Sequence, residues 1–185
     1  HVSKEGFGKT RYSWHYMSAG YVAAWATENT REAIWDAMQR REVYGTSGSR
    51  ITLRFFGGWG FTPADAETRY IADIGYTKGV PMGGDLTSAP EGKAPTFLVA
   101  AVKDPLSGNL DRVQIVKGWV GADGKAQERV YDVVWGDADR RQIGSDGRLA
   151  PVGNTVDVAK ATWADSIGDP TLGIVWTDPD FDPSQ

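Results

Sequence analysis

The clearest periodic pattern in the sequence lies just after Asn29. Apolar side chains recur there at steps of three and four residues, at Ala33, Ile34, Ala37 and Met38. Charged and amide residues fill the opposite side, which is typical of an amphipathic helix. Asn29 is placed to accept hydrogen bonds as the N-cap, and Glu32 would complete a capping box. The pattern predicts an α-helix over about residues 30–41.

Trp35 lies at the edge of this apolar stripe. Each helical residue advances by about 100°, so Trp35 is turned by that angle from Ile34. A helix that packs on one surface alone has no need of a large aromatic side chain there. A helix wedged between two parts of a larger protein would need one, so we expect Trp35 to be buried in the larger protein but at least partly exposed in residues 1–185 alone. The alternative is that the N-terminal loop, with Phe7, Tyr12 and Trp14, folds back and covers it.

Beyond the helix the period of the pattern changes to two. A polar turn at residues 46–49 is followed by an alternation of apolar and other residues over 50–56, which indicates a strand. Further strands are predicted at 69–76, 94–103, 112–120 and 127–135, and shorter ones near 155–158 and 173–176. The short apolar run 21–25 fits either a strand or a helical turn.

Three further local signals refine these predictions. The 94–103 run is apolar almost throughout, as in a strand that is covered on both faces. Asp123-Gly124 is a strong turn signal and predicts a hairpin between 112–120 and 127–135. Pro63 suits the first position of a helical turn. About seven short strands between turns predict a mainly β (α+β) fold, an antiparallel β-sandwich preceded by one capped helix.

Composition narrows the classes of function. The chain has 185 residues, 23 glycines, no cysteine and a net charge of −4. The absence of cysteine excludes disulfides, thiolate metal sites and cysteine nucleophiles, and it leaves the compartment undetermined. Neither a long apolar run nor a basic cluster occurs, so we predict no membrane span and no nucleic-acid partner. Because residue 1 is His and the last residues are irregular and polar, we expect the chain to be part of a longer protein.

Four segments of the sequence resemble a known family. They are ATENTREAIWDAMQRREVYGTSGSRITLRFFGGW, VPMGGDL, LDRVQIVKGW and WTDPDFDP. Together they resemble the C-terminal part of an uncharacterised bacterial family, the domain of unknown function 3604. The run AIWDAMQRREVYGTSG is also similar to the closing helix and strand of metal-dependent hydrolases related to polymerase-and-histidinol-phosphatase domains.

The resemblance implies a larger protein with an N-terminal barrel that carries a metal site. Residues 1–46 would then be the C-terminal end of that barrel, a loop plus the helix with a barrel-closing strand, and residues 47–185 a β-sandwich-like domain. The family's metal-ligand motifs, His-x-His and Asp-x-His, have no counterpart in this sequence. We therefore predict no catalytic residue, no metal ligand and no cofactor in this chain. A divalent metal would belong to the larger protein, whose barrel is the expected partner.

Candidate ligand-binding residues lie at two places. His15 stands between Trp14 and Tyr16, whose rings can shield its imidazole at the mouth of the larger protein's active site. A loop histidine bonded to the backbone is the alternative. The turn that contains Thr46, Ser47, Ser49 and Arg50 combines hydroxyls, backbone N–H groups and a guanidinium, which suits a small anion. Its alternative is a turn whose polar groups are bonded internally.

Two further patterns favour simpler interpretations, and a third suggests a different kind of binding. Ser47 has no nucleophile-elbow motif around it, so we do not expect a catalytic serine. Asp178, Asp180 and Asp182 alternate with prolines and lack the glycine turn of a calcium loop, so a solvated tail is favoured. Four of the eight tryptophans could form a sugar-stacking platform, namely Trp59, Trp119, Trp135 and Trp163.

These patterns lead to one preferred function and one alternative. The chain is expected to be the C-terminal segment of a metal-dependent hydrolase, which supports or lines the active site. The alternative is a non-catalytic carbohydrate- or anion-binding β-sandwich. Against the sugar platform, Trp119 and Trp135 fall on the two arms of one predicted hairpin, where cross-strand aromatic packing is common.

Overall fold

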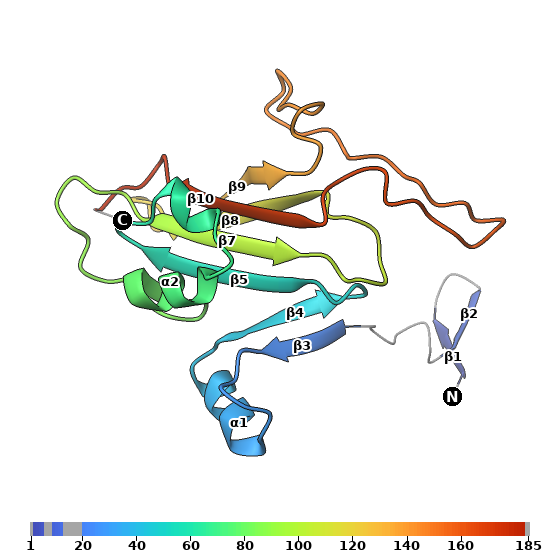
Figure 1. Ribbon diagram of the computed structural model, residues 1–185, viewed down its shortest axis with the longest axis horizontal. Coiled ribbons are helices and arrows are strands. Elements are labelled where there is room, and N and C mark those ends of the chain that lie inside the picture. The colour runs from blue at the N-terminus through green and yellow to red at the C-terminus, as the bar shows by residue number, and fades with distance from the viewer. Residues whose placement is uncertain (1, 6–8, 13–19, 184–185) are drawn as a thin grey trace.

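The computed structural model describes residues 2–5, 9–12 and 20–183 (Figure 1). The helices are α1 (Arg31–Gln39), α2 (Ile71–Lys78) and the short 3₁₀ turn η2 (Pro63–Ala66). The strands are β1 (Val2–Glu5), β2 (Lys9–Tyr12), β3 (Gly20–Ala24), β4 (Val43–Ser47), β5 (Thr52–Gly58), β6 (Gly79–Pro81), β7 (Thr96–Val102), β8 (Arg112–Val120), β9 (Ala126–Trp135) and β10 (Thr171–Thr177). The predicted mainly β fold is confirmed.

The strands form one four-stranded sheet and three two-stranded ones. The larger sheet has the order β10-β7-β5-β6, and the pairs are β1–β2, β3–β4 and β8–β9. All strand pairs are antiparallel. Within the described ranges no sheet closes into a barrel, and the strand expected to close one, β4, pairs with β3 alone. The predicted division between residues 1–46 and 47–185 falls inside β4 and stays a prediction.

The larger sheet has apolar packing on both faces. On one face Leu98 of β7 and Phe56 of β5, which are paired in register, pack with Phe61 and with Ile71 and Ile74 of α2. On the other face the buried side chains are Ala101, Leu110 and Leu172, with Val113 and Val134 of the hairpin packed against them. Each large side chain buried in this way contributes about 1.5–3 kcal/mol. The expectation that the 94–103 strand is covered on both faces is confirmed.

Helix α1 begins and ends differently from the sequence prediction. Its N-cap is Thr30, whose hydroxyl accepts a hydrogen bond of 3.3 Å from the Ala33 N–H, so the capping box expected from Asn29 and Glu32 is wrong. Adjacent Asn and Thr are both good caps, and the sequence pattern did not choose between them. The helix ends in a Schellman motif, in which the Arg41 and Glu42 N–H groups donate to the carbonyls of Met38 and Ala37.

Two predicted strands are wrong. Residues 69–76 contribute most of α2. Ile71 and Ile74 are three residues apart, so a helix turns both toward the same apolar cluster. The short run also alternates loosely, which suggested a strand. Gly75 of α2 lies against the Phe56 ring, where a Cβ atom would stand 2.4 Å from the ring. Residues 155–158 form no strand; only an isolated bridge joins Asp157 to Thr162.

Other local predictions are confirmed. Pro63 opens η2, and the Asp65 carboxylate accepts the Thr62 N–H at 2.7 Å. The β8–β9 hairpin forms around Asp123-Gly124, with a register shift between Val113 and Gln114. Both the 21–25 run, which becomes β3, and the 173–176 run, which becomes β10, are strands.

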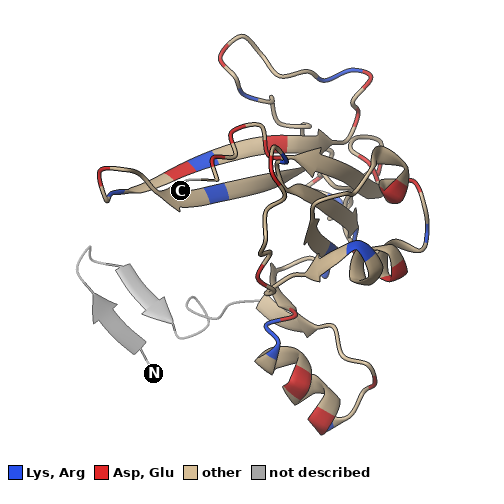
Figure 2. Cartoon of the chain, turned by 90° about the vertical axis from the view of Figure 1, so that its left-hand side faces the viewer, with Lys and Arg blue, Asp and Glu red and all other residues tan. Residues whose placement is uncertain are grey.

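The β3–α1–β4 segment projects from the rest of the described chain. Figures 1 and 2 show α1 at the far end of the β3–β4 pair, away from the four-stranded sheet.

The two α-helices of the described residues have nine and eight residues, so neither is long enough to cross a bilayer, which takes about 20.

Candidate functional site

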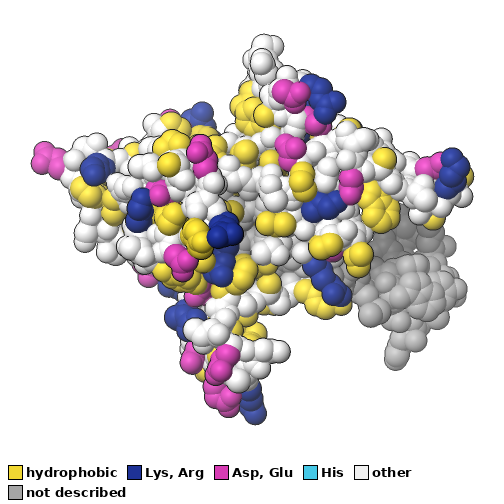
Figure 3. Space-filling view, in the orientation of Figure 1, with side chains coloured by type: hydrophobic (Ala, Val, Ile, Leu, Met, Phe, Trp, Pro, Cys, Tyr) yellow, Lys and Arg dark blue, Asp and Glu magenta, His cyan; other side chains and the backbone are white. Residues whose placement is uncertain are grey.

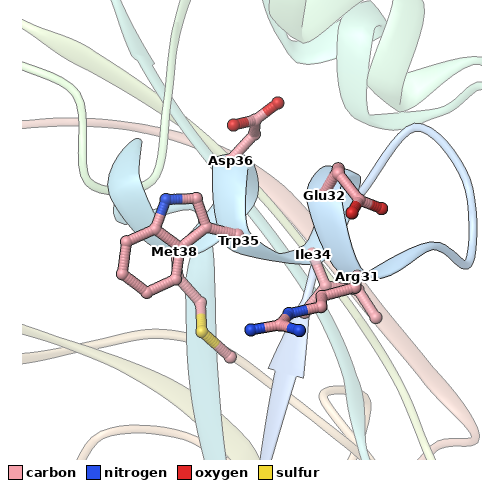
Figure 4. A pocket seen from close by; sticks show the side chains of 6 residues that line it. All are labelled: Arg31, Glu32, Ile34, Trp35, Asp36 and Met38. Atoms are coloured by element: carbon pink, nitrogen blue, oxygen red, sulfur yellow. The ribbon is translucent and has the colours of Figure 1, made fainter.

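Helix α1 buries only its small side chains. Ala33 and Ala37 are buried, whereas Trp35 is 60% exposed and Met38 is 46% exposed. Trp35 and Met38 are neighbours at i, i+3 and border a hollow of about 660 Å³ along the helix (Figure 4). The expected exposure of Trp35 is confirmed. The exposed apolar face of α1 consists of Trp35, Met38 and the half-buried Ile34.

The predicted anion turn is held by contacts with the loop after β7. Gly48 has a φ of 120°, a conformation that favours glycine. The Ser49 and Ser107 hydroxyl oxygens lie 2.7 Å apart, and the Arg50 N–H donates to the Asp104 carboxylate at 2.8 Å. This hydrogen bond, followed by one from the Leu106 N–H, lowers the pKa of Asp104 below its usual value. A carboxylate of the chain itself therefore occupies one of the donors expected to hold an external anion.

The other polar side chains of the turn differ in exposure. The Arg50 side chain is exposed, with its guanidinium 4.7 Å above the Tyr21 ring and 3.3 Å from the Tyr21 hydroxyl. Thr46 and Ser47 border a hollow of about 320 Å³. The Thr46 hydroxyl is buried and has no hydrogen-bond partner in the part of the chain that the structure describes. Thr46, Ser47 and Ser49 thus border one hollow and the Arg50 side chain lies on Tyr21, whereas His15 lies outside the described residues.

A charged hollow at the base of α1 was not anticipated from the sequence. Glu42, which directly precedes β4, is only 3% exposed, and its carboxylate accepts a short hydrogen bond from the Tyr76 hydroxyl. Arg40 and Arg54 place nitrogens 3.5 and 3.9 Å from the same carboxylate. The Arg54 guanidinium also donates to the Tyr76 oxygen at 3.3 Å and lies over the Trp25 ring, 3.2 Å from its centroid.

The charges in this hollow explain why Glu42 tolerates burial. A buried carboxylate is costly unless it is paired and hydrogen-bonded, and here a phenol and two guanidiniums surround it. Burial, and then the hydrogen bond to Glu42, raises the pKa of Tyr76 above its usual value, so the phenol keeps its proton. The sequence signals are Glu42, directly after the predicted helix, and Arg54 in an otherwise apolar strand. Neither signal indicates that the two side chains meet.

The C-terminal segment is anchored, and the expectation of a solvated tail is wrong. Asp178 is buried and pairs with Lys117 of β8 at 2.7 Å. The Asp180 carboxylate accepts hydrogen bonds from Arg129 and from the Tyr131 hydroxyl at 2.5 and 2.6 Å. These partners are distant in the sequence, so no local pattern could reveal them. Among the described residues, no group of three or more carboxylate or histidine side chains converges as a metal-ligand set.

Two of the four tryptophans considered for sugar stacking, Trp119 and Trp135, lie far apart. Trp119 is paired in register with Gln127 and Trp135 with Arg112, so they stand at opposite ends of the hairpin. This separation is roughly 23 Å at about 3.3 Å per residue, so the cross-strand packing expected between them is wrong. Trp59 packs on Phe181, and Trp163 is half exposed in the loop before β10.

Charged side chains are mixed in sign over the visible surface. Figure 3 shows Lys and Arg interspersed with Asp and Glu on this face, without a large patch of one sign. An extended basic surface is the usual electrostatic signature of nucleic-acid binding. The face in this view does not have one.

The comparison with protein families decides the relationship that the sequence motifs suggested. The sequence model of the family described as "Protein of unknown function (DUF3604)" matches residues 2–185. The chain belongs to this family. The DUF3604 match spans both the α1 segment and the anchored C-terminal segment, so the family resemblance is confirmed. No curated protein and no solved structure matches the chain.

Proposed function

We propose that this chain is the C-terminal supporting part of a larger metal-dependent hydrolase, and that α1 docks on the part that carries the metal site. The observation that carries the proposal is the exposed apolar face of α1. Trp35 and Met38 are 60% and 46% exposed on a helix that projects from the sheet. Burying a large apolar side chain is worth about 1.5–3 kcal/mol, so this face has a strong tendency to find a partner surface.

The hydrolase assignment is supported by the order of elements in the resembling segment. The run of residues 33–48 is similar to the closing helix and strand of metal-dependent hydrolases. In the structure this run contains nearly all of α1 followed by the whole of β4. The chain would line the active site from this segment, and the metal ligands would come from the rest of the protein.

Site-specific photocrosslinking tests the docking. A benzophenone amino acid is placed at Trp35 in the full-length gene product, and its crosslinks are mapped by mass spectrometry. Leu106 is the matched control, because it is apolar and 84% exposed but lies in a loop far along the chain from α1. We expect crosslinks from position 35, and none from 106, to the segment that carries the His and Asp motifs. A full-length product without such motifs, or without bound metal after purification, would contradict the proposal.

A second candidate function is the binding of a small anion by the Thr46–Arg50 turn. It is supported by the exposed Arg50 guanidinium and by the Thr46 hydroxyl, which has no hydrogen-bond partner among the described residues. Thr46 borders the hollow of about 320 Å³. Titration with phosphate, followed by NMR shifts of the backbone amides, tests it. We expect shifts centred on residues 46–50 that are lost in Arg50→Gln and kept in the exposed control Arg148→Gln. Shifts spread evenly over the basic residues would refute specific binding.

A further inference from the structure

We propose that the charged hollow at the base of α1 binds the carboxylate group of a small molecule. The hollow has a volume of about 410 Å³ and is bordered by Trp25, Arg40, Glu42, Arg54 and Tyr76. This volume lies within the range of small-molecule sites, about 300–1,000 Å³. Its walls come from the end of β3, the end of α1, β5 and α2, so the fold brings four separate segments to one point.

The charge balance of the hollow favours an anion. Arg40 and Arg54 carry two positive charges and Glu42 one negative charge, while Tyr76 is held neutral by burial and by its hydrogen bond to Glu42. One positive charge is therefore left over. A carboxylate neutralises this excess, whereas a phosphate dianion would leave the hollow with a net negative charge.

Arg54 is held in position for a ligand. Its guanidinium rests on the Trp25 ring, and the Trp25 indole N–H is itself fixed by a 3.0 Å hydrogen bond to the Leu53 carbonyl. One terminal nitrogen, Nη1, donates to Tyr76. A guanidinium has five N–H donors in a planar fork, and a carboxylate can accept two of them side by side. Because the side chain is already ordered, binding costs little further conformational entropy.

Arg40 provides a second, more exposed contact at the rim. Its side chain is 49% exposed, and its long 3.5 Å contact with Glu42 is weak enough to be exchanged for a ligand oxygen. A cationic ligand has no comparable partner in the hollow. The Glu42 carboxylate is buried and already accepts from Tyr76, and the Trp25 face is covered by Arg54.

The test is a ligand titration of the full-length protein labelled with 5-fluorotryptophan. The ¹⁹F signal of Trp25, assigned with Trp25→Phe, is followed as acetate, phosphate or tetramethylammonium is added. We expect a saturable shift with acetate and a loss of affinity of about tenfold or more in Arg40→Gln, which removes one charge-assisted contact. Arg40 lies at the rim, so this variant should keep the fold, as the remaining tryptophan signals will show.

The matched control is Arg69→Gln, because Arg69 is exposed and also lies over an aromatic ring, that of Tyr70, but borders neither proposed site. It should bind acetate with unchanged affinity. An acetate shift that does not saturate, or that weakens equally in Arg40→Gln and Arg69→Gln, would overturn the proposal. Tighter binding of phosphate or of tetramethylammonium would overturn the assignment to a carboxylate.

Discussion

Gly83 lies directly against the backbone of Arg41: a Cβ atom on Gly83 would stand 2.3 Å from the Arg41 carbonyl oxygen. Both residues have positive φ, 80° for Gly83 and 60° for Arg41. The contact joins the VPMGGDL segment to the end of α1, two of the segments that carry the family resemblance. It fixes the point from which α1 projects.

Gly83→Ala should therefore destabilise the protein. The new methyl group would meet the backbone, which cannot move aside as a flexible side chain would, and Ala disfavours a positive φ. We expect a loss of about 2–4 kcal/mol in the free energy of unfolding, measured by urea denaturation. Gly60→Ala is the control, since a Cβ atom there meets nothing within 4 Å. Equal losses in the two variants would show that this contact has no special role.

Arg41 occupies the position after the helix where glycine is usually found. We expect Arg41→Gly to be more stable than Arg41→Ala by about 1 kcal/mol, because only glycine adopts a φ of 60° without strain. Both variants lose the same exposed ion pair with Asp85, so the comparison isolates the backbone. Thermal or urea unfolding of the two proteins measures the difference. If Arg41→Ala is equally stable, the strain at this position is negligible.

Acid should weaken the fold partly through Asp65. The hydrogen bond from Lys78, followed by that from the Thr62 N–H, lowers the pKa of Asp65 below 3.8 in the folded state. The unfolded chain therefore takes up this proton first. The stabilisation from Asp65 is complete above the unfolded pKa and is lost as the pH falls through the lower folded value.

Asp65→Asn should consequently lower stability at neutral pH and reduce the further loss below about pH 4. Asp139→Asn is the control, because the Asp139 side chain is 79% exposed. Urea unfolding between pH 2.5 and pH 7 measures both variants. Parallel pH profiles for Asp65→Asn and the wild type would contradict the role given to this carboxylate.

The C-terminal segment should detach when Lys117 is removed. Lys117→Met leaves the Asp178 carboxylate, whose side chain is 7% exposed, without its ion-pair partner. We expect a loss of about 2–4 kcal/mol and faster proteolysis around residues 178–183. Lys125→Met, at a pair whose side chains are 80% and 51% exposed, should change neither. Equal proteolysis of the two variants would mean that the segment is held by other contacts.

Local signals in the sequence predicted much of the fold. The apolar steps of α1, the continuous run of β7 and the Asp123-Gly124 turn each depend on neighbouring residues, and all three are confirmed. The strand predicted at 69–76 is wrong because Tyr70, Ala72, Ile74 and Tyr76 alternate as in a strand, whereas Ile71 and Ile74 have the spacing of a helix. The structure shows that tertiary packing on Phe56 decides it.

The candidate sites were less predictable because they depend on distant partners. The sequence indicated hydroxyls and Arg50 in one turn, but Asp104, which takes the Arg50 N–H, lies 54 residues further on. Glu42 and Tyr76 are 34 residues apart, and nothing in their local sequences marks them as neighbours. The same holds for Lys117 and Asp178, whose pairing turns an apparent tail into part of the fold.

The central claim, that α1 docks on the rest of a larger hydrolase, is tested most directly by the cost of Trp35→Ala in two contexts. Unfolding free energies are measured for the variant and the wild type in residues 1–185 alone and in the full-length protein. Trp35 is 60% exposed in this chain, so we expect a small loss in the isolated chain. In the full-length protein we expect a loss of about 3–5 kcal/mol, as for a buried aromatic side chain. An equal loss in both would contradict the account.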